Sequence, residues 1–98
     1  MTYLDTIANR IRDNLSREAS PPDGADALFV LYALLARVKG ESTTAEDVHD
    51  AWAAWMQVKD RSHSALVPYN ELAPSVQDED LPFLHAIRRT AAQLNGDH

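Results

Sequence analysis

The chain has 98 residues, of which 45% are hydrophobic and 24% are charged, so it fits one compact domain with a single core. Nine Lys and Arg against fifteen Asp and Glu give a formal net charge of −6, which disfavours nonspecific nucleic-acid binding. There is no cysteine, which excludes disulfides and thiolate metal sites, and no apolar run approaches the length of a membrane span. We therefore expect a cytoplasmic protein that binds neither nucleic acid nor membrane.

The first expected helix is amphipathic. Apolar residues recur every three or four positions between Leu4 and Leu15, a spacing that places them on one helical face. Thr2 is the expected N-cap, because its hydroxyl can accept a hydrogen bond from the first turn. The pattern predicts a helix from Tyr3 to about Arg17, after which two consecutive prolines prevent its continuation.

The second expected helix is the most apolar segment of the chain. Asp23 is its predicted N-cap, and Gly40 is its predicted left-handed C-cap. Residues 27–36 are apolar almost all round, which is typical of a helix enclosed by its neighbours. The pattern predicts a central core helix in which Leu31 and Leu34 are buried.

A capping box predicts the start of a third helix. Thr43 and Glu46 are spaced so that the side chain of each can bond the backbone N–H of the other. The helix should end near Asp60. Residues 60–71 then form an ordered loop, in which a proline restricts the backbone and residues 66–69 pack on the third helix.

The remaining sequence has one long, mostly apolar pattern of helical spacing. Its members recur every three or four positions from Leu72 to Leu94, and Asp80 is the only polar one among them. Pro82 removes a helical hydrogen bond near that point. We therefore expect a short helix at 74–80 and a longer one from 81 or 82 to about 95, followed by a loose tail that includes the last two residues.

These elements together predict the fold class. We expect an all-α fold, a small single-domain bundle of four main helices with an ordered loop at 60–71 and a break near Pro82. The domain spans residues 1–98, with an N-terminal helical pair at 1–40 and a second half at 43–95.

The polar residues form no recognisable reactive constellation. The four histidines lack the i, i+4 spacing of a helical zinc site, and the three glycines are too scattered for a phosphate-binding loop. Consecutive carboxylates at 78–80 point in different directions on a helix, so a solvated helix start is favoured over a cation site. We expect no catalytic residues, no metal site, no cofactor and no enzymatic activity.

Asp80 is the polar residue with the strongest claim to a role, because a carboxylate that faces a core is costly unless it is hydrogen-bonded. Two interpretations stay open. Asp80 is either only the N-cap of the helix that contains Pro82, or it also orients His49 or a donor of a bound ligand. The side chains of Trp52 and Tyr69 are further donors that could hold it.

The second half of the chain resembles a known family. Residues 49–52 read His-Asp-Ala-Trp, residues 63–72 read His-Ser-Ala-Leu-Val-Pro-Tyr-Asn-Glu-Leu, and Asp80 follows eight positions later. These residues resemble the RyR domain, the repeat of ryanodine receptors that also occurs as single copies in bacterial and phage proteins. The segment 56–62 is shorter here than in that family. As a whole, the chain is similar to small proteins encoded by actinobacterial phages and prophages.

Two functions follow as hypotheses. The first is a small non-enzymatic interaction module, phage-encoded and acting in the host cytoplasm, that binds a host protein or itself. The alternative, which the RyR resemblance implies, is a protein that captures a nucleotide-derived signal between the third helix and the loop at 66–72. The candidate ligand- or partner-binding residues are His49, Trp52, Lys59, Arg61, Tyr69 and Asp80. Lys59 and Arg61 are the nearest cations for an anionic group of such a ligand.

Overall fold

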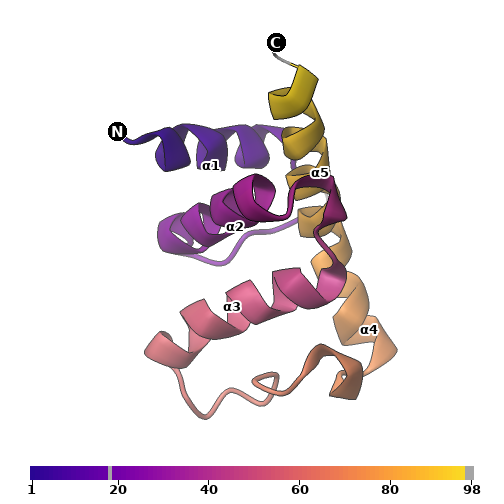
Figure 1. Ribbon diagram of the computed structural model, residues 1–98. Coiled ribbons are helices and arrows are strands. Elements are labelled where there is room, and N and C mark those ends of the chain that lie inside the picture. The colour runs from indigo at the N-terminus through magenta and orange to yellow at the C-terminus, as the bar shows by residue number, and fades with distance from the viewer. Residues whose placement is uncertain (18, 97–98) are drawn as a thin grey trace.

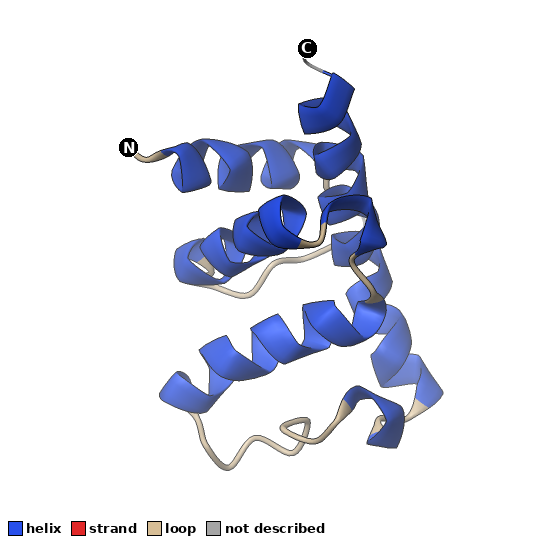
Figure 2. Cartoon of the chain, viewed as in Figure 1, coloured by secondary structure: helices blue, strands red, loops and turns tan. Residues whose placement is uncertain are grey.

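The computed structural model describes residues 1–17 and 19–96, and the expected tail at 97–98 lies outside them. The described residues form four helices of 12 to 16 residues and several shorter helical turns, and no strand occurs among them (Figure 2). The prediction of an all-α fold is therefore confirmed. The four main helices are α1 (Tyr3–Asn14), α2 (Asp26–Val38), α3 (Ala45–Lys59) and α5 (Leu81–Gly96), and the short ones are η1 (Gly40–Ser42), η2 (Tyr69–Glu71), α4 (Pro74–Gln77) and η3 (Asp78–Asp80).

The helices are arranged as a stack with one crossing element. Figure 1 shows α1, α2 and α3 lying one beneath another, while α5 runs across the same end of all three. In agreement with this view, α2 contacts α1, α3 and α5, and α5 contacts α1 and α3 as well. The expected central position of the second helix is confirmed by these contacts. No helix of the described chain is both long and apolar enough to cross a membrane.

All four main helices contribute to the core, and its aromatic cluster lies where α2 meets α5. Phe29 and Tyr32 of α2 are fully buried, and both rings contact the ring of Phe83 on α5, at centroid distances of 6.3 and 5.8 Å. Phe29 and Tyr32 themselves meet edge to face at 5.6 Å. Aromatic side chains bury large areas and prefer such tilted contacts, so this cluster fixes the crossing of the two helices.

One part of the expected core is wrong. Leu34 is 47% exposed and Leu31 is only partly buried, although both belong to the apolar run of α2. The neighbouring helices cover one side of α2, which carries Leu28 and Phe29, and leave the stripe through Leu34 and Val38 open to solvent. A helix that is apolar all round does not reveal in its sequence which side stays uncovered.

The helix starts are partly as expected. Thr2 caps α1, because its hydroxyl accepts a hydrogen bond from the N–H of Asp5, whose carboxylate accepts one from the N–H of Thr2. The helix ends at Asn14, three residues before the expected end. Asp23 is not the cap of α2, since Gly24 adopts a left-handed φ of +68° and the chain becomes helical only after Ala25.

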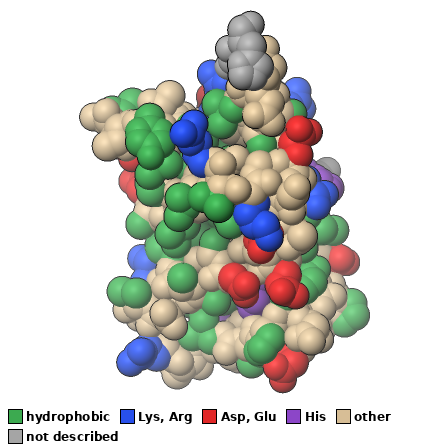
Figure 3. All heavy atoms as spheres, in the orientation of Figure 1, with side chains coloured by type: hydrophobic (Ala, Val, Ile, Leu, Met, Phe, Trp, Pro, Cys, Tyr) green, Lys and Arg blue, Asp and Glu red, His purple; other side chains and the backbone are tan. Residues whose placement is uncertain are grey.

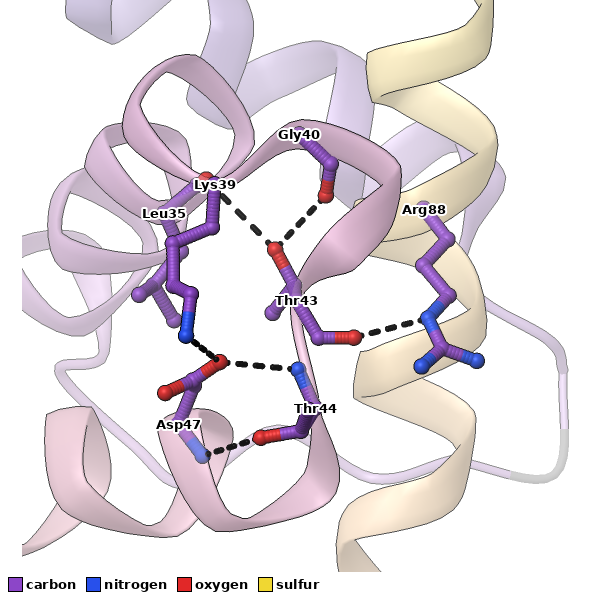
Figure 4. Close-up of polar contacts among 7 residues, drawn as sticks. All are labelled: Leu35, Lys39, Gly40, Thr43, Thr44, Asp47 and Arg88. Carbon is purple, nitrogen blue, oxygen red and sulfur yellow. Dashed lines mark hydrogen bonds and ion pairs between the residues drawn. The ribbon is translucent and has the colours of Figure 1, made fainter.

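The capping box of α3 lies one residue later than expected. Thr44 and Asp47 form it, with hydrogen bonds of 3.2 and 2.9 Å between side chain and backbone (Figure 4). Thr43 is instead fully buried, and its hydroxyl donates to the carbonyl of Gly40 at 2.7 Å. Because the turn η1 uses Thr43 in this way, the next threonine becomes the cap.

The α2–α3 connection is also tied to α5. The guanidinium Nε of Arg88 donates to the Thr43 carbonyl at 2.8 Å, as Figure 4 shows. Lys39 forms an ion pair of 3.0 Å with Asp47 on the other side of the junction. The start of α3 is thereby fixed relative to both the end of α2 and the middle of α5, which sets the position of every side chain on α3.

Two leucines of α2 should respond differently to truncation. Leu28→Ala removes a side chain that is 1% exposed, so it should lower the free energy of unfolding by about 2 to 5 kcal/mol. Leu34→Ala is the matched control on the same helix and should cost less than about 1 kcal/mol. Urea denaturation measures both values, and equal losses would contradict the observed orientation of α2.

Candidate functional site

A cavity of about 510 Å³ opens between α2, α3 and the point where η3 continues into α5. Its walls combine aromatic and apolar side chains with a few polar groups, the composition typical of small-molecule sites. The chain before α2 and the loop after α3 complete the rim. The lining residues are Ala19, Ser20, Pro22, Leu28, Tyr32, His49, Trp52, His63, Ala65, Val76, Glu79, Asp80, Pro82 and Phe83.

Local structure brings the polar side chains of the cavity together. His49 and Trp52 are three residues apart on α3 and therefore lie on the same helical face. Asp80 ends the 3₁₀ turn η3, at the point where the chain enters α5. The expected break near Pro82 is thus a 3₁₀ turn just before it, and this tighter turn directs Asp80 towards α3.

His49 is the best fixed of the polar groups. It is 3% exposed, and its ring stacks on Trp52 at 5.6 Å and meets Tyr69 at 6.3 Å. Its Nε2 lies 2.6 Å from the carbonyl oxygen of Val67. Because a carbonyl only accepts, Nε2 carries the proton and donates it. His49 therefore holds the loop against α3 through the Val67 carbonyl and Tyr69, whereas the side chains of Val67 and Pro68, which were expected to pack there, are exposed. In the neutral ring Nδ1 keeps a free lone pair.

Asp80 faces that lone pair. Its Oδ2 lies 4.0 Å from Nδ1 of His49, which is the distance of an ion pair and too long for a hydrogen bond. The pKa of the Asp80 carboxyl is raised to about 6, because burial outweighs the opposing effect of His49 and Glu79 adds a smaller increase. Burial, followed by the Asp80 charge, raises the pKa of Tyr32 above its usual range.

The interpretation of Asp80 as an N-cap is wrong. An N-cap residue has extended backbone and accepts from the first turn of its helix. Here η3 continues directly into α5, and Leu81 is already in the right-handed helical region. Within the described residues, no hydrogen bond from the first turn of α5 reaches the Asp80 carboxylate, which instead faces Nδ1 of His49 at 4.0 Å.

The structure separates the six candidate residues into two groups. His49, Trp52 and Asp80 line the cavity, and Tyr69 supports it by contacting the ring of His49. The two cations lie elsewhere: Lys59 sits 4.7 Å above the ring of Trp55, and Arg61 is exposed in the turn after α3. The cations predicted to receive an anionic ligand thus do not reach the cavity.

Two residues that line the cavity were not among the candidates from the sequence. The rings of His63 and Trp52 meet edge to face at 5.1 Å, and Nδ1 of His63 accepts a hydrogen bond from the N–H of Ala65 at 3.1 Å. Its place in the RyR-like block was the available signal. Tyr32 borders the cavity from α2, and nothing in its apolar surroundings distinguishes it from a core tyrosine. Within the described residues, no three His, Asp or Glu side chains are grouped as a metal site.

Comparison with known proteins places the chain in one family. A family model with the description "Domain of unknown function (DUF7701)" matches residues 2–92, which include every residue that lines the cavity. No curated protein and no solved structure matches the chain. The resemblance to the RyR domain stays a prediction.

The raised pKa of Asp80 predicts a pH-dependent difference in stability. A carboxyl whose pKa is about 6 in the fold, against 3.8 ordinarily, contributes stability below pH 4 and loses it as the pH rises through 6. Asp80→Asn cannot ionise. After allowance for solvent screening, it should therefore gain about 1 to 2 kcal/mol relative to the native chain between pH 4 and pH 7.

Urea denaturation at both pH values measures this difference. Asp78→Asn is the matched control, because Asp78 is an exposed carboxylate in the same 3₁₀ turn. Because the Asp78 side chain is exposed, its substitution should change the free energy of unfolding by less than about 0.5 kcal/mol. A flat profile for Asp80→Asn would show that the Asp80 carboxyl titrates as it does in the unfolded chain.

Proposed function

We propose that this chain, which belongs to the DUF7701 family, is a non-enzymatic module that binds a small organic molecule in the cavity between α2 and α3. The observation that carries the proposal is the coincidence of a 510 Å³ cavity with a small number of fixed polar groups. That volume is in the range of sites for small molecules. His49 and Asp80 would orient the ligand, while aromatic walls supply contact area.

The rigidity of the site supports binding. His49 is held by the Val67 carbonyl and by two ring contacts, so its orientation does not have to be fixed when a ligand arrives. A preorganised group loses less conformational entropy on binding, which favours affinity. The loop that forms one wall is fixed through the same hydrogen bond.

Filling the cavity should abolish ligand binding. Ala65 lines the cavity, and its N–H, which bonds to His63, survives a change of side chain. We expect Ala65→Phe to reduce the binding of any cavity ligand at least about tenfold, a loss of about 1.4 kcal/mol. Ala54→Phe is the matched control, because Ala54 is exposed on α3 outside the cavity.

The measurement is a fragment screen followed by amide NMR titrations. Fragments that bind should shift the amides of α3 and η3, and Ala65→Phe should remove these shifts while Ala54→Phe keeps them. A library that includes cationic, neutral and anionic fragments and yields no cavity ligand would overturn the proposal. So would fragments whose binding is the same in both variants.

Docking of another protein is the second candidate function. An exposed apolar surface favours it: Tyr3 is 64% exposed, Val38 is 72% exposed, and Leu34 lies one turn before Val38. Arg37 lies 5.4 Å from the ring of Tyr3 and links the two helices on this side. Figure 3 shows hydrophobic side chains gathered over α1 and α2 on the face in view.

Self-association is the directly testable form of this candidate. If the surface joins two copies, sedimentation velocity should show a dimer whose dissociation constant rises at least about tenfold in Leu34→Lys. The control is Val58→Lys, because Val58 is exposed at the far end of α3. A native chain that stays monomeric up to millimolar concentration would exclude self-association through this surface.

A further inference from the structure

The charge of the cavity restricts the ligand, given the proposed binding function. Apart from Tyr32, the ionisable side chains that line it are the carboxylates Glu79 and Asp80 and two histidines. No Lys or Arg belongs to the described lining. An anionic group would therefore meet carboxylates without a compensating cation. A ligand recognised through a phosphate or carboxylate does not fit these walls.

The polar atoms inside the cavity favour a ligand that donates hydrogen bonds. His49 is nine-tenths buried, and its Nε2–H is already used by the Val67 carbonyl. In the neutral ring Nδ1 is then an acceptor, and no hydrogen bond to it is found within the described residues. Asp80 Oδ2 faces it at 4.0 Å and, when ionised, is an acceptor as well. Two acceptors so placed can both receive hydrogen bonds from one N–H-bearing group.

The walls suit a flat, positively charged group. The indole of Trp52 lies beside His49 on one side of the cavity, and Tyr32 and Phe83 line it from α2 and α5. The faces of such rings attract cations, and the attraction strengthens where water is excluded. The aromatic walls and the carboxylate therefore favour the same kind of ligand.

From this geometry we infer that the cavity binds a small planar organic cation, such as an amidinium, a guanidinium or a protonated nitrogen heterocycle. Its N–H groups donate to Asp80 Oδ2 and to Nδ1 of His49, while its plane lies against the aromatic walls. This ligand differs from the nucleotide-derived signal that the RyR resemblance implies as an alternative, whose anionic group would have met Lys59 and Arg61.

Affinity should depend on pH through Asp80. The groups that face Asp80 are His49 from α3, Glu79 from its own turn and Tyr32 from α2, and His63 lines the same cavity. Below pH 6 the carboxyl gains a proton and loses its charge. Loss of that charge weakens cation binding, so affinity should fall between pH 7.5 and pH 5.

Three probes of nearly equal shape test the inference. Benzamidinium, benzamide and benzoate carry one positive, no and one negative charge on the same aromatic ring. NMR titration at pH 7.5 should show benzamidinium binding at least about tenfold more tightly than benzamide, with benzoate weakest, because a charge-assisted hydrogen bond adds 1.4 kcal/mol or more. At pH 5 the preference for benzamidinium should shrink to about threefold or less.

Substitution of the carboxylate tests its part directly. Asp80→Asn should reduce the benzamidinium preference to about threefold or less while benzamide binding is kept, whereas Asp78→Asn, which is not in the lining, should leave both unchanged. If Asp80→Asn does not fold, the pH series on the native chain gives the same test.

The outcomes separate this inference from the proposed function. Benzamide binding as tightly as benzamidinium, or benzoate binding best, would overturn the cation assignment and leave a small-molecule site standing. The same holds if none of the three probes binds while other fragments occupy the cavity. Failure of every fragment in the screen would overturn the binding function itself, and the cation assignment with it.

Discussion

The contact of Phe83 with Phe29 and Tyr32 is the constraint on which the other features depend. It fixes the point at which α5 crosses the stack of helices. Since η3 leads directly into α5, the same contact sets where Asp80 meets α3. Tyr32 belongs both to this aromatic cluster and to the cavity wall, so the packing of the core and the shape of the cavity depend on the same side chain.

A single histidine, His49, holds the loop after α3 in place. The loop after α3 has little regular structure, and few of its backbone groups are paired by secondary structure. Nε2 of His49 donates a hydrogen bond to the Val67 carbonyl, and the short turn η2 packs on α3 beside it. Loss of that hydrogen bond would leave a half-buried carbonyl unpaired and free a wall of the cavity. Loop order and cavity shape are therefore coupled through one side chain.

Helices with a clear stripe or a single cap could be predicted from the sequence. Thr2 stands alone as a capping candidate, so α1 was placed correctly at its start. Two successive threonines offered α3 two caps, and burial of Thr43 by the preceding turn decided between them. The exposure of Leu34 could not be foreseen, because an all-apolar helix carries no polar face to mark the solvent side. Likewise, cavity walls such as Tyr32 arise from helix crossing, which local patterns do not encode.

The crossing of α5 over three earlier helices also affects the order of folding. A hydrogen bond from Asn14 to Thr90 joins residues 76 positions apart, and the buried faces of α1 and α2 remain uncovered until α5 packs on them. As the ribosome releases a chain from its N-terminus, α1 and α2 can pair early through local contacts. The apolar surface that α1 and α2 share then stays uncovered until residues 81–96 have left the ribosome. Throughout that interval the nascent chain exposes apolar side chains of α1 and α2, and the native core is complete only after α5 has packed on them.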